Sequence, residues 1–278
     1  MLRTRSPANP GRPPRWRRWQ LRGPGYFKRL GPGIVTGAAD DDPSGIGTYS
    51  QVGAAFGLGL LWTTLATLPL AVAVQEATAR LGLVTGKGLA ALLRQHFPRP
   101  VLLGAVGLVA VANTFNIGAD IGSMAAAAGL LVPVPQTVAA VGFALVMLVL
   151  EVTVPYHRYA RVLRWLALSL LAYVGVLTVV HVDWAAVLAQ TVVPHLPSDR
   201  AVVAALLAVF GTTISPYLFF WQAAEEVEEQ AERADPVDRR HLAAMRLDVV
   251  AGMGSGVAVM FAIMTTAAVT LGRTARCR

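Results

Sequence analysis

The stretch that decides the fold spans residues 33–49 and reads GIVTGAADDDPSGIGTY. It lies in an apolar block long enough to cross a bilayer, yet three carboxylates and a proline interrupt it. Each carboxylate at the bilayer centre costs about 2.5–3.5 kcal/mol. Pro43 removes an amide donor and disfavours helical geometry at Asp42, while Gly45 and Gly47 carry the chain through the break at low cost. Irregular backbone at membrane depth occurs where it lines a cavity or is buried in protein. This segment is therefore a candidate cation site with carboxylate and carbonyl oxygens as ligands.

Composition places the chain among integral membrane proteins. Hydrophobic residues make up 55% of it, charged residues make up 14%, and the mean hydropathy is +0.54. The formal charge of +8 comes from the N-terminus: residues 1–30 hold nine Lys or Arg and no acidic residue, which leaves 15 basic and 16 acidic residues in the rest. A nucleic-acid-binding protein is disfavoured because no folded basic face accompanies this tail. The single cysteine, Cys277, excludes an internal disulfide and a thiolate metal cluster.

Three segments are expected along the chain. Residues 1–30, rich in Arg, Pro and Gly, are predicted to form a disordered basic tail in the cytoplasm. Residues 31–272 are predicted to form a transmembrane transporter domain, and residues 273–278 an atypical C-terminal end. Apolar blocks of about 20 residues in this domain predict transmembrane spans. There are seven: the interrupted block from residue 33, then 60–79, 101–126, a block ending near 151, 165–181, 201–223 and 248–271.

Positive charges predict the orientation in the cell membrane. The loops 80–100, 157–164 and 224–247 hold four, three and four Lys or Arg, whereas the alternate loops hold only Arg200. The positive-inside rule then places the N-terminus in the cytoplasm and the C-terminus outside. The ending RTARCR puts three arginines on the outer side against that rule, so we expect a fragment or a frame-shifted end.

A second interruption lies in the predicted sixth span, where residues 211–217 read GTTISPY. Alone, this run is equally typical of a simple proline kink in a membrane helix. Two interrupted helices five spans apart are, however, the signature of inverted five-helix repeats, in which both breaks meet at a midplane site.

Three motifs resemble one known family. The runs LGPG (30–33) with DPSG (42–45), QVGAAFG (51–57) and ARLGLVTGK (79–87) closely resemble the NRAMP family of divalent metal transporters, over roughly residues 28–270. The resemblance implies an all-α membrane protein with the LeuT-type inverted-repeat fold, broken helices 1 and 6, and an apparent truncation after about seven transmembrane helices. It also implies a transporter rather than an enzyme, with a divalent metal ion as substrate, the lipid bilayer as surroundings, and no cofactor.

The resemblance also implies a ligand set. In the family, an Asp-Pro-Gly-Asn motif and an Ala-x-x-Met-Pro-His motif hold the metal. The matching positions here are Asp42, Gly45, Thr212 and Ser215, with Tyr217 in place of the histidine. Loss of the methionine and the asparagine leaves a roomier site of oxygen ligands, which suits magnesium, calcium or manganese better than softer metals. The chain therefore resembles most the magnesium-transporting branch, with manganese or iron transport as the alternative.

The third span contains a polar run, NTFNIGADIG, at residues 113–122. In proton-coupled members of the family an Asp and a Glu lie here on the proton path. The resemblance places Asn116 and Ala119 at these positions, although a shift of one residue would bring Asp120 into play. Because Tyr217 also replaces the histidine, we interpret transport as driven by the ion gradient and the membrane potential without proton coupling.

Two further carboxylates precede Asp42. Successive helical residues point about 100° apart, so Asp40, Asp41 and Asp42 cannot all face one ion. We predict that Asp41 supplies a second charge at the mouth of the site.

Two other functions stay open at this point. One is a proton-coupled manganese or iron importer of the ordinary NRAMP type. The other is a non-transporting membrane remnant or metal sensor, since seven spans do not complete the second repeat and we expect no transport by residues 1–278 alone. A membrane enzyme is poorly supported, because the sequence contains no Ser-His-Asp or His-Glu-x-x-His arrangement.

Overall fold

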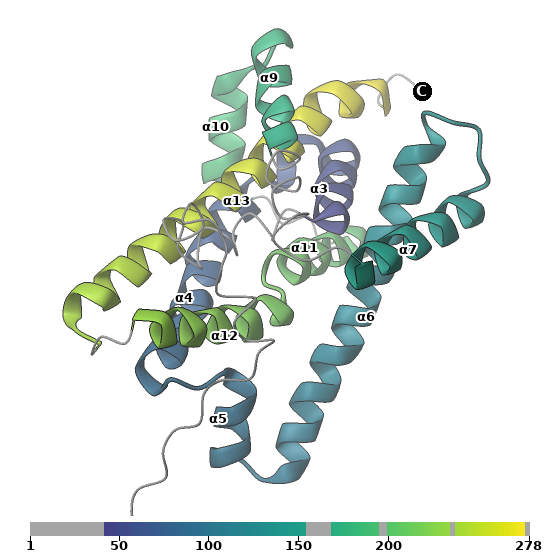
Figure 1. Cartoon of the computed structure of the whole chain (residues 1–278). Helices are drawn as coiled ribbons and strands as arrows, with labels where there is room; N and C mark the ends of the chain where they lie inside the picture. Colours follow the sequence, from purple (N-terminus) through teal and green to yellow (C-terminus); the bar gives the residue numbers. More distant parts are fainter. Residues whose placement is uncertain (1–41, 154–167, 195–198, 234–236, 276–278) are drawn as a thin grey trace, which may run out of the picture. The chain divides into compact units, whose positions relative to one another are not determined.

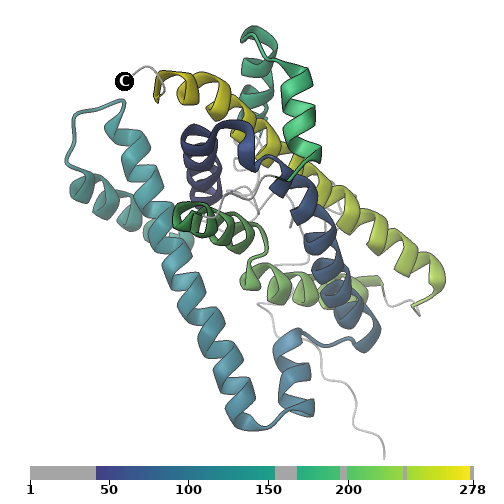
Figure 2. The ribbon, with the colours of Figure 1, turned by 180° about the vertical axis from the view of Figure 1, so that it is seen from behind.

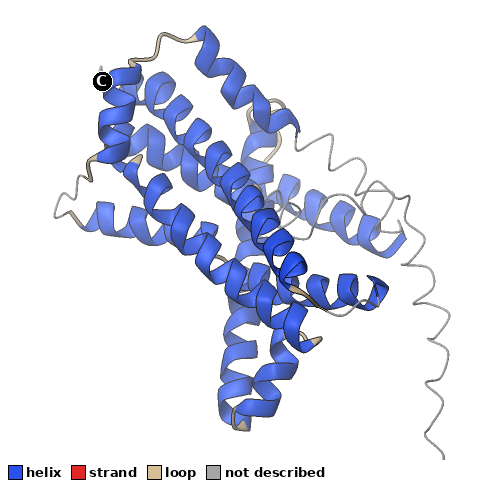
Figure 3. Ribbon diagram, turned by 90° about the vertical axis from the view of Figure 1, so that its left-hand side faces the viewer, coloured by secondary structure: helices blue, strands red, loops and turns tan. Residues whose placement is uncertain are grey.

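The computed structural model describes residues 42–153, 168–194, 199–233 and 237–275. The chain divides into two units, residues 1–30 and 31–278, and every described residue belongs to the second. The predicted basic tail lies outside the described residues. Within them the regular structure is entirely helical (Figure 3). The helices are α3 (Pro43–Phe56), α4 (Trp62–Thr85), α5 (Leu89–His96), α6 (Arg99–Gly129), α7 (Gln136–Thr153), α9 (Leu171–Val179), α10 (Trp184–Val192), α11 (Arg200–Thr213), α12 (Pro216–Arg233) and α13 (Arg239–Ala275) (Figure 1).

Helices α3 and α4 form a sharply bent pair. The short 3₁₀ helix Gly57–Leu60 joins them, and the two helices meet at an angle of 109°. Gly57 has a φ of 60°, a left-handed value that glycine adopts without steric cost. The chain therefore reverses direction just before residue 60, where the second predicted span begins.

Of the first predicted interruption, the structure describes Asp42 and the residues after it. Asp42 is extended, with φ −75° and ψ 166°, and Pro43 is the first helical residue of α3. Gly45 and Gly47 are helical residues of α3, so our expectation that they carry the chain through the break was wrong. Proline fits the first helical position because the missing amide has no intrahelical partner there. Gly47 instead permits close packing, since a Cβ on it would lie 3.2 Å from the hydroxyl of Ser123 on α6.

Helix α13 organises the core. It packs against both α3 and α4 (Figures 1 and 2). Against α3 the approach is so close that a Cβ on Gly53 would collide with the carbonyl oxygen of Met264. One buried cluster joins α3, α11 and α13 through Tyr49, Val209 and Ile263, and a second joins α4 and α13.

Helices α6 and α7 expose apolar side chains. In each, the most apolar stretch of 18 residues is long enough to cross a membrane and contains no buried residue. Four described helices are long and apolar enough to span a membrane, or five if the bent α3–α4 pair counts as one span. The seven predicted spans exceed this count for two reasons. Residues before 42 and at 154–167 lie outside the described ranges, and α9 has only nine residues.

Three segments predicted as loops contain helices. Helix α5 lies within 80–100, α10 lies within 182–200, and α12 and α13 extend into 224–247. In the segment 182–200, the Asp183 side chain accepts hydrogen bonds from the first amides of α10 and so starts a helix. In the segment 224–247, the run AEEVEEQAER at 224–233 consists mostly of strong helix formers. Charge therefore marks where a helix becomes too polar for the membrane core rather than where it ends.

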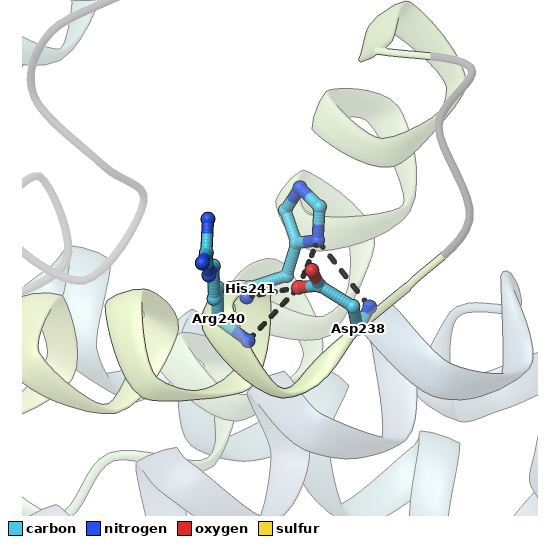
Figure 4. Close-up of polar contacts among 3 residues, drawn as sticks. All are labelled: Asp238, Arg240 and His241. Atoms are coloured by element: carbon cyan, nitrogen blue, oxygen red, sulfur yellow. Dashed lines mark hydrogen bonds and ion pairs between the residues drawn. The ribbon is translucent and has the colours of Figure 1, made fainter.

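The start of α13 is capped by Asp238 (Figure 4). Its Oδ1 accepts hydrogen bonds from the backbone nitrogens of Arg240 and His241, each at 2.9 Å. The imidazole Nδ1 of His241 lies 2.8 Å from the same carboxylate. The His241 amide, then the Arg240 amide and the imidazole, hold the pKa of Asp238 below its ordinary value. This exposed cap fixes the start of a helix of 37 residues.

Candidate metal site

Asp42 occupies the N-cap of α3. Its Oδ1 accepts hydrogen bonds from the Gly45 amide at 2.6 Å and from the Ser44 hydroxyl at 2.8 Å. This geometry follows from the sequence, because an N-cap carboxylate satisfies the amide three residues later and Pro43 between them has none to satisfy. The carboxylate of Asp42 is thus fixed at the point where the first interruption ends.

Helix α6 brings two polar side chains to the same point. Asn116 Nδ2 donates to Asp42 Oδ2 at 2.9 Å. Asp120, one helical turn further on, accepts a hydrogen bond from the Ser44 amide at 2.9 Å. Residues four apart lie on one face of a helix, so the polar run in the third span faces the start of α3.

The break between α11 and α12 contributes the third group of residues near Asp42, after those from α3 and α6. Tyr217, in the first turn of α12, donates from its hydroxyl to Asp42 Oδ2 at 3.4 Å. Ser215 lies in the break, and its hydroxyl donates to the Thr212 carbonyl oxygen at 2.7 Å. The hydroxyl oxygen of Thr212 is buried and has no hydrogen-bond partner among the described residues. Both interruptions therefore contribute residues near Asp42.

The site carries two carboxylates. Both carboxylates accept a hydrogen bond from Ser44: Asp42 from its side-chain hydroxyl and Asp120 from its backbone amide. Within the described ranges, neither forms an ion pair with Lys, Arg or His. The positive end of the α3 macrodipole partly offsets this charge. The same ranges hold no cluster of three or more His, Cys, Asp or Glu that could bind a metal, so neutral oxygen atoms would have to complete any ligand set.

Five of the predicted site residues converge through direct contacts: Asp42, Gly45, Asn116, Asp120 and Tyr217. At Gly45 the group that faces Asp42 is the amide, a donor, rather than an oxygen.

The other predicted site residues are less closely tied to this point. Thr212 and Ser215 lie a few residues before Tyr217, and their role as ligands stays a prediction. Asp41 lies outside the described residues.

Of the two alignments considered for the third span, the one shifted by one residue agrees with the contacts: Ala119 is exposed, and Asp120 contacts the start of α3. One feature of the site was not foreseen. Ser44 was overlooked, although its amide donates to Asp120, its hydroxyl donates to Asp42, and the same hydroxyl oxygen lies 3.1 Å from Asn116 Oδ1. The signal was its position directly after Pro43 at the start of a helix, where small hydroxyl residues form local side-chain hydrogen bonds.

Comparison with known proteins identifies the family. A family model described as "Natural resistance-associated macrophage protein-like", NRAMP, matches residues 33–276. The chain belongs to this family. The NRAMP resemblance of its sequence motifs is thereby confirmed.

Several NRAMP relatives are named divalent metal cation transporter MntH. The protein of Burkholderia ambifaria is 31% identical over 242 residues, which cover 86% of this chain and 55% of that protein. The protein of Verminephrobacter eiseniae is 33% identical over 195 residues, which cover 68% of this chain and 44% of that protein. The chain thus spans about half the length of the curated relatives it matches.

Solved structures agree on the fold. Crystal structures of variants of the Eremococcus coleocola manganese transporter superpose with a TM-score of 0.69 at 20% identity, covering 89% of this chain and 52% of that one. At this identity the likeness concerns the fold alone. It confirms the all-α LeuT-type architecture that the NRAMP resemblance implied.

Proposed function

We propose that this NRAMP chain carries the metal site of a divalent metal cation transporter, with the ion bound at Asp42 between α3, α6 and α12. The observation that carries the proposal is the pair of carboxylates, Asp42 and Asp120, on either side of Ser44. Charged side chains inside membrane spans are costly and mark ion pathways. A divalent cation would supply the positive charge that the described side chains do not.

Manganese is the first candidate for the ion. The solved neighbours are named manganese transporters and the relatives divalent metal cation transporters, and these names give no support to the magnesium preference expected from the sequence. Magnesium is the second candidate, because Ser44, Asn116 and Ser215 offer hard oxygen atoms and Ser215 stands where a thioether would favour softer metals.

A proton-coupled importer is the second candidate mechanism. The contact between Asp120 and the Ser44 amide favours it, since this carboxylate lies beside the ion position. Our expectation of uncoupled transport rested on alignment to Ala119 and on Tyr217. The two mechanisms differ in whether an imposed pH gradient drives uptake against a metal gradient.

The test is uptake in proteoliposomes by a version of the protein that spans the whole length of its relatives, with manganese, magnesium and calcium in competition. Asp42→Asn keeps the side-chain volume but removes the charge, and we expect uptake to fall to the level of protein-free vesicles. The matched control is Asp199→Asn at the N-cap of α11, where Asn also caps well and uptake should be unchanged. Saturable divalent-metal uptake by Asp42→Asn at the unmodified rate would overturn the proposed site.

A further inference from the structure

Side-chain oxygen atoms of Asp42, Ser44 and Asn116 lie close together at the start of α3. Ser44 Oγ lies 2.8 Å from Asp42 Oδ1 and 3.1 Å from Asn116 Oδ1. Ser44 and Asp42 come from the start of α3, whereas Asn116 comes from α6. The ligand set inferred from the sequence did not include Ser44, and placed Asn116 on a pathway rather than at the ion.

The orientation of the Asn116 amide is decided by its neighbour. A carboxylate can only accept hydrogen bonds, so the group 2.9 Å from Asp42 Oδ2 must be the amide nitrogen Nδ2. The carbonyl oxygen of the amide is therefore the atom that faces Ser44.

The number of protons does not match the number of oxygen contacts. The Ser44 hydroxyl has one hydrogen and two acceptors within reach, Asp42 Oδ1 and Asn116 Oδ1. The bond to the charged carboxylate is the stronger of the two. The Asn116 carbonyl then faces a hydroxyl lone pair, an arrangement that is repulsive without a cation between the oxygens. Ser44 is also buried, with 8% of its surface exposed, so water gives it little compensation.

The spacing of these oxygens suits a metal ion. Adjacent oxygens around an octahedral Mg²⁺ ion, at metal–oxygen distances of about 2.1 Å, lie about 3.0 Å apart. The two observed separations of 2.8 and 3.1 Å lie on either side of that value. Ser44 Oγ is thus already spaced from each of its two oxygen neighbours as adjacent ligands of one small divalent cation would be.

We propose that Ser44 Oγ and Asn116 Oδ1 are direct ligands of the transported cation, together with Asp42. The inference rests on the proposed function and gives α6 a direct ligand of the ion. It assigns the neutral oxygens of the site to one hydroxyl and one amide, a set suited to a hard divalent ion such as Mn²⁺ or Mg²⁺. Gly45 stands where the family motif has an asparagine, and it has no side chain to offer as a ligand. In the proposed site, the amide oxygen of Asn116 on α6 supplies the ligand that this asparagine would have supplied.

The inference is tested by Mn²⁺ binding to the purified protein, with free Mn²⁺ measured by electron paramagnetic resonance. Asn116→Leu removes the amide at similar volume, and we expect the dissociation constant to rise about tenfold or more. Asn116→Asp restores an oxygen while removing the amide donor, so binding should stay within about threefold of the unmodified protein. Ser44→Ala should weaken binding about as much as Asn116→Leu. Asn113→Leu is the control, because Asn113 is exposed one turn earlier on α6.

The outcomes separate the two proposals. If the unmodified protein binds no divalent cation, the proposed function fails and this inference fails with it. If it binds Mn²⁺ and both Asn116→Leu and Ser44→Ala bind equally well, only the inference is overturned. If Asn116→Asp is as weak as Asn116→Leu, Asn116 acts by orienting Asp42 and is not a ligand. Should Asn116→Leu fail to fold, Ser44→Ala decides the matter, with Ser44→Thr as the variant that should rescue binding.

Discussion

The hydroxyl groups of Tyr49 and Thr213 lie 2.8 Å apart in the buried core, although 164 residues separate them in sequence. Tyr49 is on α3, two turns beyond Asp42, and Thr213 is the last residue of α11. The contact therefore ties the helix that follows the first interruption to the helix that precedes the second. Thr213 also donates to the Val209 carbonyl at 2.8 Å, which leaves Tyr49 as the donor in the shared bond.

We expect Tyr49→Phe and Thr213→Val each to lower the free energy of unfolding by about 1 kcal/mol, the usual net value of a hydrogen bond. Because one bond is shared, the double variant should lose less than the sum of the two. Thermal unfolding of the detergent-solubilised protein measures this. Thr114→Val is the control, since Thr114 is exposed and bonds only within its own helix at Ala110. Strictly additive losses would show that the contact contributes no stability.

Close packing of α3 on α13 makes a second prediction. A Cβ on Gly53 would collide with the backbone oxygen of Met264, and backbone cannot move away as a flexible side chain can. We expect Gly53→Ala to destabilise the protein by about 1–3 kcal/mol, as overpacking does. Gly104→Ala on α6 has no atom within 4 Å of the new Cβ, and should change stability by less than about 1 kcal/mol, towards greater stability. Equal effects in the two variants would contradict the packing described.

The third prediction concerns how residue 215 affects the choice between cadmium and magnesium. Ser215→Met should raise cadmium affinity, because a thioether binds soft metals, and should weaken magnesium entry by filling space used by its waters. Competition between the two ions for uptake by the version that spans the whole length of the relatives measures the change. Ser255→Met on α13, where the hydroxyl also bonds to its own helix, is the control for the added volume. An unchanged cadmium-to-magnesium ratio would mean that residue 215 does not face the ion.

The cap of α13 gives a prediction for acidic pH. The pKa of Asp238 is lowered in the folded protein by the His241 amide first. The cap therefore stabilises α13 fully above the ordinary aspartate pKa of about 3.9, and this contribution is lost as pH falls through the lower folded value. The protection of the amides of residues 240 and 241 against hydrogen exchange, relative to the unfolded chain at the same pH, should fall at that point. Asp238→Asn should keep this protection throughout, whereas Asp238→Ala should lack it at every pH.

Much of the fold was predictable because membrane-spanning sequences are constrained so strongly. The interruption at Asp42-Pro43 was visible in the sequence, since carboxylates and proline have few acceptable positions in lipid. The helices that lie within predicted loops could not be seen in the hydropathy pattern. Helix α10 and the end of α12 depend instead on a capping residue and on helix propensity. The bend of 109° between α3 and α4 depends on one left-handed glycine, and its size could not be read from the sequence.

The site was predictable in part. Asp42 and Tyr217, which the family motifs picked out in the sequence, lie in contact in the structure, and their role at an ion stays a prediction. The roles of Ser44 and Asn116 depend on how α6 is rotated against α3, and a rotation by one residue exchanges Asp120 for Ala119. Only the tertiary contacts fix that rotation.

The uncovered apolar surface of α6 and α7 bears on the order in which the protein is made. Both helices can partition into lipid on leaving the translocation machinery, since their membrane-compatible windows bury nothing. Helix α4 is synthesised earlier but carries Gln75, which is 2% exposed once α12 and α13 pack on α4. Those two helices emerge after α6 and α7. Synthesis and assembly therefore run in different orders: the α6–α7 hairpin can enter the bilayer at once, while the polar residues of α4 are covered only after α12 and α13 have been made.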